Sequence, residues 1–159
     1  MNFLEKNLED ILFESDNKDL QERGLCISGF KKRQLRIGNY GIADLITISR
    51  GYIFDGKVYE PLSITIYELK QNEINYNSLK QIITYARGVQ LYLEKRKEWT
   101  IDIDYQLDLI LIGAKININD SFCYIPSLFK NIKFYTYTYK IDGIEFNDNE
   151  GYYITDGGF

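Results

Sequence analysis

The sequence contains no histidine among its 159 residues. Histidine is the usual base of serine and cysteine hydrolases and a common zinc ligand, so its absence excludes those classes of site. Catalysis would have to come from carboxylates, lysine, tyrosine or a bound metal. Cysteine is also scarce: Cys26 and Cys123 lie far apart, without a C-x-x-C spacing. We therefore expect no disulfide and no zinc site, and we interpret both as buried small side chains in a reducing compartment.

Long apolar segments and linkers are missing too. No apolar run approaches the roughly 20 residues of a membrane span, and the segment from Met1 to Glu14 carries acids among its leucines, unlike a signal peptide. We expect a cytoplasmic protein that does not bind membranes. Only two prolines occur, and no repeat or low-complexity stretch is present. We therefore predict one domain over residues 1–159, with a core at about 4–116 and additional C-terminal strands and a tail at 117–159.

Hydrophobic periodicity predicts the secondary structure. The predicted elements are a helix at 2–15, a loop at 16–22, strands at 25–30, 42–49 and 63–70, a hairpin turn at Asp55-Gly56 within 51–62, a helix ending near residue 96, and strands at 105–116 and 132–139. Asn77 or Ser78 is the expected cap of the second helix. This order predicts an α/β or mixed α+β fold, with helices packed on a sheet that includes a hairpin.

Three polar residues in the predicted strands suggest a metal site. Glu68 and Lys70 are two residues apart on one strand, so they project to the same face, and Asp44 lies near the start of another strand, beside Gly41. Two neighbouring carboxylates repel each other, and a divalent cation relieves that repulsion. Mg²⁺ prefers oxygen ligands and keeps several waters, so two carboxylates and the backbone carbonyl of Leu69 would suffice. Lys70 would hold or activate a water, or stabilise charge on a phosphate.

This pattern resembles the PD-(D/E)XK nuclease superfamily. The matching segments are Gly41-Ile42-Ala43-Asp44-Leu45, Tyr67-Glu68-Leu69-Lys70 and Gln81-Ile82-Ile83-Thr84-Tyr85. The last is similar to the Q-x-x-x-Y helix motif of RecB-like branches, and Arg33-Gln34 before the Gly/Asp strand resembles the archaeal-type endonuclease branch. The resemblance covers about residues 4–90. Ala43 departs from it by standing at the motif's proline, and the long gap between Asp44 and Glu68 is attributed to the hairpin at 51–62.

The resemblance implies a restriction-endonuclease-like central mixed sheet flanked by helices, and a Mg²⁺- or Mn²⁺-dependent nuclease acting on DNA in preference to RNA. Asp44 and Glu68 would bind the metal, and Lys70 would assist the attacking water. Gln81 would orient the site or contact the phosphate, with Tyr85 one helical turn away on the same face.

The first helix also resembles that of the family, in which a glutamate joins the metal site. The matching residues are Glu5-Lys6-Asn7-Leu8-Glu9-Asp10-Ile11-Leu12. At about 100° per residue, Glu5 lies nearer to the apolar stripe of the helix than Glu9 does. Glu5 is therefore the favoured ligand, and Glu9 is the second choice.

A basic run and one helical arginine are candidates for contact with nucleic acid: Lys31, Lys32, Arg33, Gln34, Arg36 and Arg87. The run is equally compatible with a solvated loop, and the net charge of −4 argues against attraction of nucleic acid by the whole surface. An alternative function stays open: a catalytically silent nucleic-acid-binding or assembly subunit with the nuclease fold. A homodimer or a partner subunit is compatible with either function.

Overall fold

The computed structural model describes residues 5–50, 53–54, 57–58, 62–97, 105–117 and 124–149. Its main strands are β1 (Phe30–Arg36), β2 (Ile42–Ser49), β5 (Leu62–Leu69), β7 (Tyr105–Gly113), β9 (Ile132–Lys140) and β10 (Gly143–Asp148). They form one six-stranded sheet in the order β1-β2-β5-β7-β9-β10. The central strands β5, β7 and β9 are parallel, and the outer strands pair antiparallel to their neighbours.

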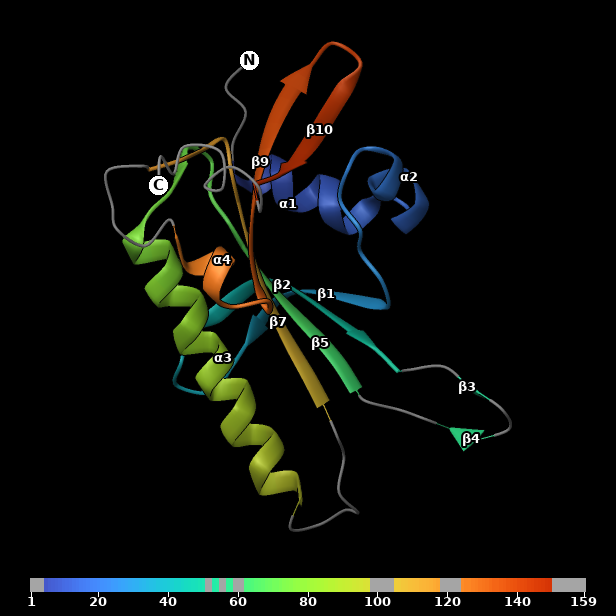
Figure 1. Cartoon of the computed structure of the whole chain (residues 1–159), viewed down its shortest axis with the longest axis vertical. Helices are drawn as coiled ribbons and strands as arrows, with labels where there is room; N and C mark the ends of the chain where they lie inside the picture. Colours follow the sequence, from blue (N-terminus) through green and yellow to red (C-terminus); the bar gives the residue numbers. More distant parts are fainter. Residues whose placement is uncertain are drawn as a thin grey trace.

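Helices cover both faces of this sheet (Figure 1). On one face lie α1 (Glu5–Glu14) and α2 (Asn17–Glu22), whose leucines share a buried cluster with residues of β2, β5, β7, β9 and β10. On the other lies the long helix α3 (Tyr76–Lys97), which buries its own apolar stripe against the same sheet, and the short α4 (Ile125–Leu128) packs beside it. The predicted fold class, a mixed sheet flanked by helices, is confirmed.

Two small strand pairs complete the described elements. The short strands β3 (Ile53–Phe54) and β4 (Lys57–Val58) pair antiparallel, as the hairpin signal at 51–62 predicts, although Asp55-Gly56 itself lies outside the described residues. A parallel pair forms between β6 (Glu73–Ile74) and β8 (Lys115–Ile116). Of the helices in the described ranges, none is both long enough and apolar enough to cross a membrane.

The segment between α1 and β2 differs from its prediction. Residues 17–22 form α2 where we expected a loop, because Leu20 is fully buried against the neighbouring cluster. The predicted strand at 25–30 is wrong: the strand begins at Phe30 and contains the basic run. Leu25 and Ile27 point inward from an extended segment, which leaves Cys26 exposed rather than buried as expected. Cys123 and the tail at 150–159 lie outside the described residues.

The start of α3 also differs from its prediction. Asn75 precedes the helix, and its Oδ1 accepts a hydrogen bond from the backbone N–H of Ser78 at 3.0 Å. In return, the Oγ of Ser78 accepts the backbone N–H of Asn75 at 2.9 Å. This reciprocal arrangement is a capping box. Ser78 therefore belongs to the cap as its third helical residue, and Asn77 does not provide it.

Replacing Asn75 should weaken the anchorage of α3. We expect Asn75→Ala to lower the free energy of unfolding by about 1 kcal/mol, because the first turn loses a side-chain acceptor. Asn77→Ala is the matched control, since Asn77 is an exposed asparagine inside the same first turn. Urea unfolding followed by circular dichroism measures both. An Asn77→Ala variant that loses more stability than Asn75→Ala would contradict the assignment of the cap.

Candidate active site

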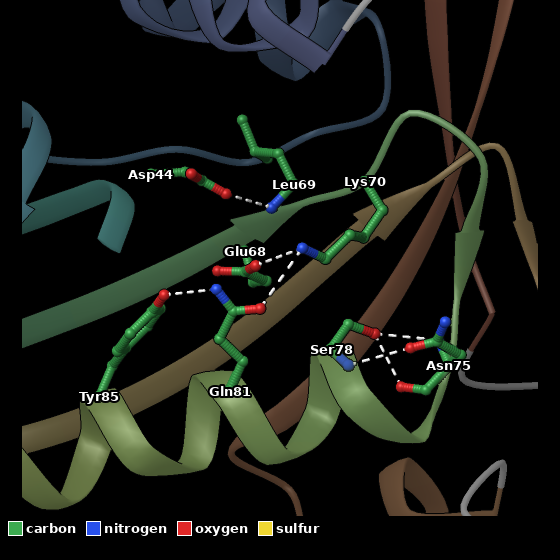
Figure 2. Close-up of polar contacts among 8 residues, drawn as sticks. All are labelled: Asp44, Glu68, Leu69, Lys70, Asn75, Ser78, Gln81 and Tyr85. Atoms are coloured by element: carbon green, nitrogen blue, oxygen red, sulfur yellow. Dashed lines mark hydrogen bonds and ion pairs between the residues drawn. The ribbon is translucent and has the colours of Figure 1, made fainter. Parts of the chain in front are cut away.

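The site lies where β2 separates from β5. The β2–β5 pairing ends at Leu45↔Tyr67, whereas β5 stays paired with β7 as far as Leu69↔Ile112. The backbone N–H of Leu69 faces the side that β2 has left, and it donates instead to Oδ2 of Asp44 at 2.9 Å (Figure 2). A side-chain carboxylate thus replaces a backbone acceptor at the end of the ladder. Because N–H and C=O of one strand residue face the same neighbour, the Leu69 carbonyl also points to this gap.

Glu68 points from β5 toward α3, on the same face as Ile64 and Ile66. Its side chain is only 1% exposed, and its Oε1 lies 2.7 Å from Nζ of Lys70. The other oxygen, Oε2, is buried and has no hydrogen-bond partner within the described structure. A buried carboxylate oxygen without a partner is costly, so this atom marks a position that favours a cation or a donor.

A short hydrogen-bonded chain joins Lys70 to α3 (Figure 2). Nζ of Lys70 donates to Oε1 of Gln81 at 3.4 Å, and Nε2 of Gln81 donates to the hydroxyl of Tyr85 at 2.6 Å. The amide of Gln81 therefore uses its acceptor on the lysine and its donor on the tyrosine. Because Tyr85 accepts this bond, its own hydroxyl proton is directed elsewhere. The structure brings together the predicted residues Glu68, Lys70, Gln81 and Tyr85.

Glycine lets the turn before Asp44 approach α3 closely. Gly41 has φ +123°, and a Cβ added there would lie 2.6 Å from Cε1 of Tyr85. Gly88 plays the reciprocal part on the helix, since its added Cβ would lie 2.7 Å from Ile37 and 2.8 Å from the ring of Tyr40. Both contacts are too short for any other residue without movement. Glycine at these positions therefore sets how near Tyr85 lies to Asp44.

Burial dominates the electrostatics of the two carboxyl groups. It raises the pKa of Asp44 to about 6, while the hydrogen bond from Leu69 opposes the shift. Burial, followed by the charge of Asp44, raises the pKa of Glu68 to about 7, against the opposing effect of Lys70. Burial alone would lower the pKa of Lys70, but the hydrogen bond and charge of Glu68 outweigh it and raise that pKa. The lysine is therefore an ammonium at neutral pH, beside two acids that resist ionising together.

The two glutamates of α1 lie differently. The charge of Glu5 acts on Asp44, Glu68 and Lys70 alike. Glu9 acts only on Asp44 within this set, and its Oε2 accepts a hydrogen bond from Nε2 of Gln34 at 2.6 Å. The geometry therefore favours Glu5 over Glu9 as a neighbour of the site.

The donor set suits a hard divalent cation. Asp44 and Glu68 supply carboxylate oxygens, one of them orphaned and buried, and the Leu69 carbonyl faces the same gap. Among the residues that the structure describes, however, no three carboxylate, thiol or imidazole side chains lie close enough together to hold a metal ion. A metal would accordingly be bound by two carboxylates, a carbonyl and water.

Three of the six residues predicted to contact nucleic acid form hydrogen bonds within the protein instead. Arg33 donates to Asp10 at 2.8 Å and stacks on the ring of Phe13, and Lys31 donates to the carbonyl of Ser15. Gln34 is bound to Glu9, as described above. The structure therefore ties these three side chains to α1.

The other three predicted contacts, Lys32, Arg36 and Arg87, are exposed. Arg87 lines a groove between α3 and β7 together with Gln90 and Asn131. It lies two residues after Tyr85, about 200° around the helix, so the structure does not bring it to the site.

Sequence reasoning missed Tyr137 of β9. Its hydroxyl donates to the carbonyl of Gln71 at 2.6 Å, directly after Lys70. Burial and the charge of Glu5 raise the pKa of the Tyr137 phenol. The effect of Glu5 indicates that the phenol also lies near the N-terminal end of α1. The alternation of tyrosine with threonine in this strand signals a packed aromatic face, but it does not reveal which loop that face reaches.

Comparison with known proteins adds no relative from which a function could be inferred. No family model, curated protein or solved structure matches the chain. The resemblance to PD-(D/E)XK nucleases therefore remains a prediction from the sequence motifs.

Because the pKa of Asp44 is raised, replacing its carboxyl group with a neutral amide should stabilise the fold by an amount that depends on pH. The folded protein binds this proton more tightly than the unfolded chain, because the pKa is about 6 rather than 3.8. Ionisation therefore removes stability as the pH rises from about 4 to 7. In EDTA, Asp44→Asn should raise the free energy of unfolding by about 1–2 kcal/mol at pH 8 and by much less at pH 4.

Thermal unfolding of both proteins at the two pH values measures this difference. Asp10→Asn is the control, because its carboxylate is partly exposed and paired with Arg33. It should show no gain at pH 8. A loss of stability in Asp44→Asn at pH 8 would show that ionised Asp44 stabilises the fold.

Proposed function

We propose that this protein is a Mg²⁺- or Mn²⁺-dependent nuclease of the PD-(D/E)XK type that hydrolyses phosphodiester bonds in DNA. The observation that carries the proposal is the buried carboxylate of Glu68, which has one oxygen on Lys70 and the other without a partner, and which feels the charge of Asp44. Such an arrangement costs stability, and strongly perturbed acids beside a fixed cation are typical of catalytic sites.

Asp44, Glu68 and the carbonyl of Leu69 would hold the ion, with Glu5 as the nearest further carboxylate. When bound, it makes an attacking water easier to deprotonate and offsets negative charge on the phosphate. The ion would also allow both carboxyl groups to ionise at neutral pH, since its charge relieves the repulsion that raises the pKa of Glu68.

Lys70 would act as a positively charged hydrogen-bond donor. Its raised pKa keeps it protonated, so it is suited to orient a water or to stabilise charge on a phosphate oxygen rather than to accept a proton. Glu68 and Gln81 hold the ammonium from two sides, and its side chain remains 26% exposed. The lysine side chain is therefore partly open to solvent.

Gln81 and Tyr85 would align the lysine and the substrate. Both polar atoms of the Gln81 amide are used, one toward Lys70 and one toward Tyr85, so the orientation of the amide is fixed. The hydroxyl proton of Tyr85 is then free to bind a phosphate oxygen. This arrangement gives the Q-x-x-x-Y spacing a physical role at the site.

The internal bonding of the basic run favours a second candidate, a catalytically silent nucleic-acid-binding or assembly subunit. Lys31, Arg33 and Gln34 are tied to α1, and the whole chain carries a net charge of −4. Its own attraction to a polyanion is therefore weak. A partner subunit or a second copy would then supply much of the grip on DNA.

The nuclease proposal predicts a specific requirement for Lys70. Purified protein should cut labelled single-stranded, duplex or branched DNA in Mg²⁺ or Mn²⁺ and not in EDTA. Lys70→Ala should reduce the rate by at least about 100-fold, because it removes the charge that stabilises the transition state. RNA of the same sequence should be cut more slowly.

Lys140→Ala is a matched control for this experiment. Lys140 also pairs with a glutamate at 2.7 Å, but its pair with Glu145 is exposed on the β9–β10 hairpin. Its replacement should leave the cutting rate within about twofold, as surface pairs contribute little. A folded, metal-supplied protein that binds DNA but cuts neither DNA nor RNA would overturn the nuclease proposal in favour of the silent subunit.

A further inference from the structure

Along the antiparallel ribbon of β1 and β2, side chains that should stay on one face of the sheet change to the other face. At its middle, Arg33 pairs with Leu45. Both side chains lie on the α1 face, since Arg33 stacks on Phe13 of α1 and Leu45 belongs to the cluster under α1. In a regular strand, residues two positions further along would project to the same face.

The pair formed by Leu35 and Ala43 lies on the opposite face. Leu35 pairs with Ala43, and both pack in the cluster under α3. The ribbon has therefore turned over between these pairs, in both strands at once. The residues at the reversal are Gln34 on β1 and Asp44 on β2.

Gln34 has the backbone conformation that causes such a reversal. Its φ is 51°, and no other non-glycine residue in the described part of the chain has a positive φ. A left-handed residue within a strand changes the side to which the following side chains point, as in β-bulges that re-aim a side chain. For a residue with a Cβ this conformation costs roughly 1–2 kcal/mol, so neighbouring contacts must maintain it.

Two consecutive contacts to α1 maintain it. Nε2 of Gln34 donates to Oε2 of Glu9 at 2.6 Å, and Arg33 donates to Asp10 at 2.8 Å. The first contact fixes the side chain of the left-handed residue, and the second fixes the residue before it. Both acceptors belong to one rigid helical turn.

The reversal changes the direction of Asp44. With regular alternation, Asp44 would share the α3 face with Ile46, two residues away. Its carboxylate is directed instead at the edge of β5, where it accepts the N–H of Leu69 (Figure 2). The acid thereby reaches the gap between the strands rather than the core under α3.

We propose that Gln34 is a positioning residue: its left-handed backbone, held by Glu9, turns the β1–β2 ribbon over and directs the carboxylate of Asp44 onto the amide of Leu69. Its side chain is thus occupied by a structural contact, in place of the nucleic-acid contact expected from the sequence. The inference deepens the proposed function and rests on it only for its consequence, the placement of a metal ligand.

The test compares Gln34→Gly, which adopts a positive φ without strain, with Gln34→Val, whose β-branched side chain resists it. The readout is the amide resonance of Leu69 in ¹⁵N-labelled protein in EDTA, with Asp44→Ala as the reference for the lost hydrogen bond. We expect Gln34→Gly to retain the wild-type resonance and Gln34→Val to move it at least halfway to the reference. Arg36→Val, at another exposed site on the same strand, should not move it.

A Gln34→Val protein with the Leu69 resonance at its wild-type position would overturn the proposal. Glu9→Ala provides a second variant if Gln34→Val does not fold, because it leaves the sequence of β1 intact. It should accelerate hydrogen exchange at Leu69 by about tenfold, equivalent to a loss of about 1.4 kcal/mol in the local opening free energy. An unchanged exchange rate would also overturn the proposal.

Metal titration separates this inference from the proposed function. If that function is correct, Gln34→Val should weaken Mn²⁺ binding by about tenfold while Arg36→Val does not, since only the former misdirects a ligand. If the amide resonances behave as expected but the wild-type protein neither binds Mn²⁺ nor cuts DNA, Gln34 positions Asp44 and the nuclease proposal fails.

Discussion

The hydrogen bond from the amide of Leu69 to the carboxylate of Asp44 joins the fold to the site. A sheet cannot open between two strands without leaving backbone donors and acceptors unpaired, and burying those groups is costly. Here β2 leaves β5 after Leu45↔Tyr67, and a side chain from β2 itself supplies the missing acceptor. The side-chain oxygen of Asp44 therefore satisfies a backbone donor that the opening would otherwise leave unpaired.

Charge and helix placement depend on this opening. Burial raises the pKa values of both Asp44 and Glu68, and Lys70 offsets only part of that effect on Glu68. The lysine is in turn fixed by Gln81 of α3, whose position relative to the strands is set by close contact with Gly41. Oε2 of Glu68 is buried without a partner within the described structure, which costs stability unless a cation or a hydrogen-bond donor occupies that position.

Hydrophobic pattern was sufficient to predict helices packed on a sheet, the positions of α1 and α3, and the shared face of Glu68 and Lys70. These features depend on alternation within one element, and so does the spacing of Gln81 and Tyr85. The pairing of Gln34 with Glu9 was not predictable, because it joins elements whose relative placement depends on the whole core. The left-handed conformation of Gln34 has no signature either, since glycine or asparagine usually occupies such positions.

The contacts between the basic run and α1 have a second consequence for the site. Arg33 and Gln34 bind Asp10 and Glu9 in one turn of α1, and Lys31 binds the carbonyl of Ser15 just after the helix, so the three contacts fix the helix against the edge strand. Glu5 lies one turn beyond Glu9, at the end of α1 whose charge reaches Asp44 and Glu68. The N-terminal end of a helix carries partial positive charge, which favours a carboxylate there. One edge strand is therefore linked to two acids by separate routes: to Asp44 through the reversal of the ribbon, and to Glu5, a neighbour of the site, through the helix.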